Sequence, residues 1–71
     1  MQNDMITVFV KEERKNQNLT QQELAEKSGV SVRSVSSIEL GESVRKSTIE
    51  KVLETLGFKM IIRYEFKKLK K

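Results

Sequence analysis

The fold is decided by residues 19–41, which read LTQQELAEKSGVSVRSVSSIELG. Thr20 followed by Glu23 forms a capping box, in which each side chain bonds a backbone N–H of the other at the start of a helix. Gly29 ends this helix, because glycine adopts the left-handed backbone that closes a helix without steric cost. Ser31 is placed to cap a second helix. Two short helices joined by a tight, glycine-containing turn have the geometry of a helix-turn-helix.

A further helix is predicted before this stretch, over about residues 4–16. Ile6, Phe9 and Val10 fall at the i, i+3 and i+4 positions of one helical face. Ile6, Val8 and Val10 also alternate as they would in a strand, and β-branched residues are frequent here. The charged, unbranched residues that follow Val10 favour the helix.

The strongest amphipathic signal in the chain comes after the stretch. Four apolar residues fall at i, i+3, i+4 and i+7, namely Ile49, Val52, Leu53 and Leu56. Ser47 and Glu50 predict a second capping box at the start of this fourth helix. Gly57 predicts its end.

The pattern changes to a period of two beyond Gly57. Five apolar residues alternate there with polar ones, apart from Ile61, and are Phe58, Met60, Ile62, Tyr64 and Phe66. Alternation of this kind predicts a β-strand over residues 58–66. A helical alternative would line up Phe58, Ile61, Ile62, Phe66 and Leu69, and the β propensity of the segment favours the strand.

The rest of the chain is predicted to be helical, so this strand has no partner strand within its own chain. Its open edge would pair with the same strand of a second subunit, around a two-fold axis near Ile62. The five alternating apolar residues would then form the dimer interface and cover the helical cores of both subunits. The predicted organisation is a helical domain over residues 1–57, a dimerisation strand over 58–66 and a basic tail over 67–71.

Composition narrows the possible functions. The 71 residues contain no Cys and no His, which excludes disulfides and the usual zinc sites. A core this small is marginal alone, so oligomerisation is expected. The net charge of +4 comes from the four lysines of the tail, so residues 1–66 are neutral. No serine has a histidine to activate it and no glycine-rich phosphate loop appears, so neither an enzyme nor a cofactor is expected. The apolar stretches are too short to span a bilayer, and a cytoplasmic protein is expected.

The motif resembles the phage repressor and Cro helix-turn-helix family, also called Xre-like regulators. The matching residues are Leu19, Thr20, Gln21, Glu23, Leu24, Ala25, Gly29, Val30, Val35, Ile38, Glu39 and Gly41. With Arg14 and the fourth helix, the resemblance covers residues 5–57. It implies a mainly α, four-helix, lambda-repressor-like domain that binds double-stranded DNA.

The resemblance also implies which residues meet the DNA. It makes the helix after Ser31 the recognition helix of the major groove, with base contacts from Val32, Arg33, Ser36 and Ser37. Arg33 has the strongest base-reading chemistry, because its planar fork can bond guanine O6 and N7 together. Val32 departs from the family, which often has Gln at this position. The implied phosphate contacts are Gln21, Ser34, Arg45 and Lys46.

Arg14 and Glu39 match an arginine–glutamate pair of the family, which implies a partly buried salt bridge that pins the recognition helix. The implied function is that of a homodimeric repressor on a palindromic operator. The alternative is an antitoxin that binds a toxin protein and represses its own operon. Membrane-surface binding by residues 58–71, as a basic amphipathic helix, is a third possibility.

Overall fold

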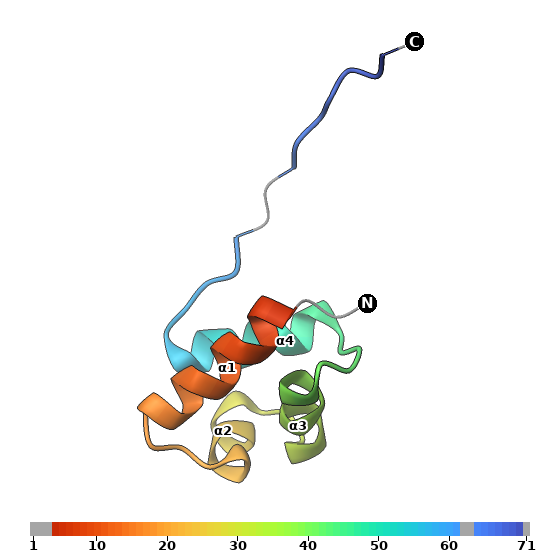
Figure 1. Ribbon diagram of the computed structural model, residues 1–71. Helices are drawn as coiled ribbons and strands as arrows, with labels where there is room; N and C mark the ends of the chain where they lie inside the picture. Colours follow the sequence, from red (N-terminus) through yellow and green to blue (C-terminus); the bar gives the residue numbers. More distant parts are fainter. Residues whose placement is uncertain (1–3, 62–63, 71) are drawn as a thin grey trace.

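Four α-helices form the domain (Figure 1). The computed structural model describes residues 4–61 and 64–70. The helices are α1 (Asp4–Asn16), α2 (Gln21–Ser28), α3 (Val32–Leu40) and α4 (Lys46–Leu56). All four were predicted from the sequence, and residues 6–10 belong to a helix and not to a strand. Within the described residues, no helix has the length and apolar character needed to cross a bilayer.

The α2–turn–α3 unit is held by local signals. At the start of α2, the Thr20 hydroxyl accepts from the Glu23 backbone N–H at 3.0 Å, and the Glu23 carboxylate accepts from the Thr20 N–H at 2.8 Å. Gly29 has φ = 73°, in the left-handed region, and ends the helix. The Ser31 hydroxyl caps α3 by accepting from the Ser34 N–H at 3.1 Å. The capping box, the glycine turn and the serine cap are therefore confirmed.

One core joins all four helices. It contains nine buried apolar residues, which are Val10, Leu24, Ala25, Val35, Ile38, Ile49, Val52, Leu53 and Leu56. α4 supplies four of them, at the spacing that the sequence showed. Burying an aliphatic side chain of this kind stabilises the fold by about 1.5–3 kcal/mol. The core thus fixes how α3 sits against the other helices, although α3 itself is rich in serine.

The start of α4 differs from the prediction. The helix begins at Lys46, its N-cap is Arg45, and within the described residues this cap makes no side-chain hydrogen bond. The predicted capping box of Ser47 and Glu50 is therefore wrong, because both residues already lie inside the helix. Packing of Ile49 and the residues that follow it sets this helix in place without a side-chain cap.

The predicted strand over residues 58–66 is also wrong for the single chain. Residues 58–61 and 64–70 form neither strand nor helix, and Ile62 lies outside the described residues. A strand exists only through backbone hydrogen bonds to a neighbouring strand, and the rest of the described chain is helix, turn and loop. Residues 58–61 instead stay beside the helices, whereas residues 64–70 lead away from them (Figure 1).

Two predicted interface residues contact their own domain. The ring of Phe58 meets the ring of Phe9 edge-on, with centroids 4.8 Å apart and an interplanar angle of 82°. Met60 is half-buried and packs against the core. The other two described members, Tyr64 and Phe66, are exposed.

Candidate nucleic-acid interface

α3 has a buried face and an exposed face. Val35 and Ile38 are fully buried against the other helices. The positions predicted to contact bases lie on the opposite side at i, i+1, i+4 and i+5, which one helical face can present together; they are Val32, Arg33, Ser36 and Ser37.

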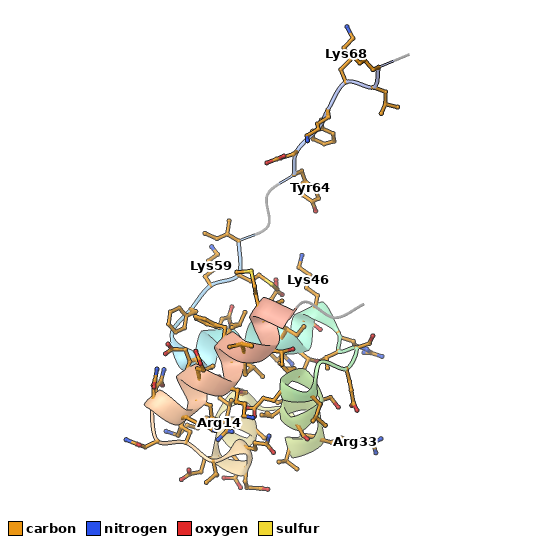
Figure 2. The ribbon with its side chains drawn as sticks, viewed as in Figure 1. Arg14, Arg33, Lys46, Lys59, Tyr64 and Lys68 are labelled. Carbon is orange, nitrogen blue, oxygen red and sulfur yellow. The ribbon has the colours of Figure 1, made fainter. Side chains whose placement is uncertain are left out.

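Exposure differs among these four residues. Arg33 is exposed, and Figure 2 shows its guanidinium projecting outward from α3. Val32 is also exposed, whereas Ser36 and Ser37 are half-buried. The outer face of α3 therefore carries one long cation among short side chains, which leaves room for a partner to approach the helix closely.

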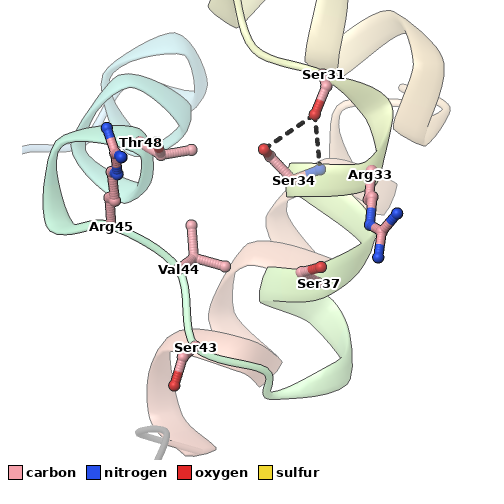
Figure 3. Close-up of a pocket in the computed structure, with 8 residues that line it drawn as sticks. All are labelled: Ser31, Arg33, Ser34, Ser37, Ser43, Val44, Arg45 and Thr48. Carbon is pink, nitrogen blue, oxygen red and sulfur yellow. Dashed lines mark hydrogen bonds between the residues drawn. The ribbon is translucent and has the colours of Figure 1, made fainter.

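An open hollow of about 400 Å³ lies between the start of α3 and the loop that leads into α4 (Figure 3). Its lining contains two arginines, five hydroxyl groups and one valine, which are Arg33, Arg45, Ser31, Ser34, Ser37, Ser43, Thr48 and Val44. Guanidinium and hydroxyl groups are common donors to phosphate oxygens. The hollow therefore has the chemistry to hold a phosphate.

The structure brings some predicted phosphate contacts together here. Ser34 and Arg45 line the hollow from its two sides, and the exposed Lys46 is the next residue along the chain. The Ser34 hydroxyl lies 3.0 Å from the Ser31 hydroxyl, so these two groups already share a hydrogen bond.

Sequence reasoning missed Ser43 and Thr48 as lining residues. Thr48 lies in the first turn of α4, which begins at Lys46, before the predicted cap at Ser47. Ser43 lies in the loop before α4, where no regular spacing marks which side chains face inward.

Behind α3, a polar network ties three helices together. Arg14 Nε donates to Glu39 Oε2 at 2.7 Å, and Arg14 Nη2 donates to Glu39 Oε1 at 3.1 Å. Arg14 Nη1 donates to the Leu19 carbonyl at 2.8 Å. The side chains of Arg14 and Glu39 are only 12% and 4% exposed. One guanidinium from α1 thus holds both the entry to α2 and the end of α3, as the implied salt bridge required.

The charges of this network stabilise each other. Burial by itself would raise the pKa of Glu39, but the hydrogen bonds from Arg14 and Gln21 outweigh it and hold that pKa below its usual value. The hydrogen bond to Glu39 raises the pKa of Arg14 above its usual value, against the opposing effect of burial. Both groups are therefore charged at neutral pH.

Gln21 has a structural partner as well as a predicted DNA role. Its Nε2 donates to Glu39 Oε1 at 3.0 Å, so Gln21 joins the polar network. A side-chain amide carries two N–H donors and one acceptor, so a phosphate contact from the same residue is compatible with this bond. Gln21 is also the first residue of α2, where backbone N–H groups favour anions.

Comparison with known proteins shows which family has this arrangement of helices. A family model described as "Helix-turn-helix" matches residues 10–61, which is most of the chain and includes all of α2, α3 and α4. No curated protein matches the sequence.

Proposed function

The chain belongs to the Xre-like helix-turn-helix family of DNA-binding transcription regulators, and from this premise we propose that it is a repressor. In this proposal, a homodimer binds a palindromic operator in double-stranded DNA. α3 enters the major groove, its exposed residues contact base edges, and residues around the hollow contact the backbone.

The observation that carries the proposal is the asymmetry of α3. Its rear is held by the buried core and by the Arg14–Glu39 pair. Its front offers Arg33 beside short side chains. A rigidly held helix with one extended, bidentate donor suits the reading of guanine in the major groove.

Phosphate binding in the hollow would set the register of α3 on the duplex. Arg45 and Lys46 stand at the start of α4, and Ser34 stands at the start of α3. Contacts to one strand of the backbone from both sides of the hollow would orient α3 without reading sequence. Arg33 would supply the discrimination between bases.

Dimer formation would follow from the apolar residues after α4. Tyr64 and Phe66 are exposed in the single chain, and burial against a second copy would supply the stability that a 71-residue chain lacks. A two-fold axis would present two copies of α3 to half-sites about 34 Å apart, or a multiple of that distance.

Arg33→Ala tests base recognition. We expect footprinting on the DNA upstream of its own gene to reveal a symmetric site, and the variant to bind this site more weakly by about 1–3 kcal/mol. It should also lose discrimination at one base pair in each half-site. Lys46→Ala should instead weaken binding to all sequences alike and lower the salt dependence by about one unit.

Lys27→Ala is the matched control, because Lys27 is an exposed cation in the last turn of α2 and does not line the hollow. It should bind the operator as the wild type does. Equal losses for Arg33→Ala on operator and random DNA would contradict base recognition and make Arg33 a phosphate contact.

The antitoxin alternative stays a prediction. It differs from the repressor proposal in requiring a second protein, and the same DNA contacts would serve both. Copurification with the product of the neighbouring gene, in a fixed ratio, would favour it.

A further inference from the structure

Leu40, the last residue of α3, is a large apolar residue that the fold leaves exposed to solvent. Its exposed fraction is 71%. A single exposed leucine is common on protein surfaces and indicates no function by itself. Leu40 differs from such a residue in its position, because it lies on the side of α3 that faces DNA in the proposed function.

The outer face of α3 is centred near Leu40. Successive residues of an α-helix are turned by about 100° around its axis. Measured from Val32, the four residues predicted to contact bases lie at about 0°, 100°, 40° and 140°, and Leu40 lies at about 80°. The buried Val35 and Ile38 lie on the opposite side, at about 300° and 240°. Leu40 therefore shares the face of the predicted base contacts.

The side chain of Leu40 is directed toward those residues. Leucine side chains in helices point back toward the N-terminus and cover the preceding turn. In α3 that turn contains Ser36 and Ser37, whose side chains are short and half-buried. Leu40 thus adds an apolar surface to the middle of the face, where the two serines leave space.

The backbone at Leu40 is held firmly at the end of the helix. The Gly41 N–H donates to the Ile38 carbonyl at 3.2 Å, and the Glu42 N–H donates to the Ser37 carbonyl at 2.9 Å. These two bonds close the helix as a Schellman motif. The residue before Leu40 carries the buried ion pair to α1. Leu40 is therefore presented in a fixed position, and a partner that covers it needs to order little backbone.

We propose that Leu40 reads a thymine by packing on its 5-methyl group in the major groove. This inference rests on the DNA binding of the proposed function and adds a specificity-determining residue to it. Thymine alone among the four bases presents a methyl group in that groove, and apolar side chains recognise it by contact. The same approach of α3 that brings Arg33 to a base edge brings Leu40 to the groove, because both lie on one face.

Val32 gives the contact a second, independent reference point. It is 41% exposed and is the other large apolar residue that α3 exposes. Eight helical residues separate it from Leu40, a distance of about 12 Å along the axis, and neighbouring base pairs are about 3.4 Å apart. The two residues would therefore meet thymines no more than about four base pairs apart.

Exchange of thymine for uracil tests the contact, because uracil lacks only the methyl group and pairs with adenine in the same way. Each thymine in one half-site of the footprinted operator is replaced in turn, and the Kd of the full-length protein is measured. At the thymine under Leu40, the wild type should bind the uracil operator about fourfold more weakly, the effect of one buried methyl group. Leu40→Ala should bind the thymine operator more weakly and should not distinguish it from uracil at that position.

Three further variants sharpen the measurement. Leu40→Met keeps a long apolar side chain and should keep the sensitivity to uracil. Val32→Ala should lose sensitivity at a different thymine. Leu69→Ala is the matched control, because it makes the same substitution at a residue that is 84% exposed and outside α3, and it should have the uracil profile of the wild type. Leu40→Ala should stay folded, since alanine is the better helix former, and thermal unfolding checks this.

Two outcomes would overturn the inference and leave the proposed function standing. If Leu40→Ala weakens binding but keeps the full uracil profile of the wild type, Leu40 contacts the sugar–phosphate backbone and not a base. If Leu40→Ala binds every operator as the wild type does, its exposed surface serves a partner other than DNA. In both cases the guanine preference of Arg33 would still show base recognition by α3. If footprinting finds no operator, the proposed function falls as well.

Discussion

The helix-turn-helix unit at residues 19–41 and the C-terminal segment at residues 58–70 have equally regular sequence patterns but different structures. In the first, the caps, the glycine turn and the spacing of apolar residues agree with the packing around them. In the second, a period of two gives no strand among the described residues of the single chain. A sequence pattern determines which side chains share a face, but a strand also requires a partner that the pattern does not identify.

The largest expected contrast between the two regions is in stability. Leu24→Ala removes a fully buried side chain of α2 and should destabilise the domain by about 3 kcal/mol through lost burial and a residual cavity. Leu69→Ala makes the same chemical change at an exposed position of the C-terminal segment and should shift stability by less than about 0.5 kcal/mol. Urea unfolding at one protein concentration measures both. A similar loss for the two variants would mean that the C-terminal segment is packed as firmly as the core.

An effect of intermediate size is expected on how the stability of the helical domain depends on pH. The pKa of Glu39 is lowered in the folded chain, so this residue stabilises the fold above its unfolded pKa. That stabilisation is lost as the pH falls through the lower, folded pKa, because the unfolded chain then binds the proton more readily. The urea concentration at the unfolding midpoint of the wild type should therefore decrease when the pH is lowered from 7 to 3.

Glu39→Gln is the comparison for this measurement. This variant should be less stable than the wild type at pH 7 and should lose less stability on acidification. Part of the pH dependence should remain. Glu23 also has a lowered pKa, chiefly because it accepts hydrogen bonds from Thr20. If Glu39→Gln keeps the full acid dependence of the wild type, the Arg14–Glu39 pair does not contribute to it.

The smallest expected effect is the difference in stability between variants of the two capping boxes that the sequence predicted. Thr20→Ala removes a cap that is present and should cost about 1 kcal/mol. Ser47→Ala removes a hydroxyl inside α4, where alanine is the better helix former, and should be neutral or slightly stabilising. Thermal unfolding of the two variants side by side checks this. A comparable loss for Ser47→Ala would mean that it caps α4 after all.

Much of the fold could be predicted because its signals are local. A hydroxyl followed three residues later by a glutamate, or a glycine at a helix end, acts on the backbone within one turn of the chain. The fourth helix shows the limit of such signals. Ser47 and Glu50 have the spacing of a capping box, yet tertiary packing begins the helix at Lys46.

The sequence by itself determined the four helices, the glycine turns and the face of α3 that is exposed, because helical periodicity and caps depend on neighbours in the chain. Only the tertiary structure decided that Gln21 joins Arg14 and Glu39, and that Ser43 and Thr48 line the same hollow as Ser34. It also placed Phe58 on Phe9 and left Phe66 uncovered. These contacts join residues far apart in sequence, and their geometry follows from how the helices pack, which no local pattern records.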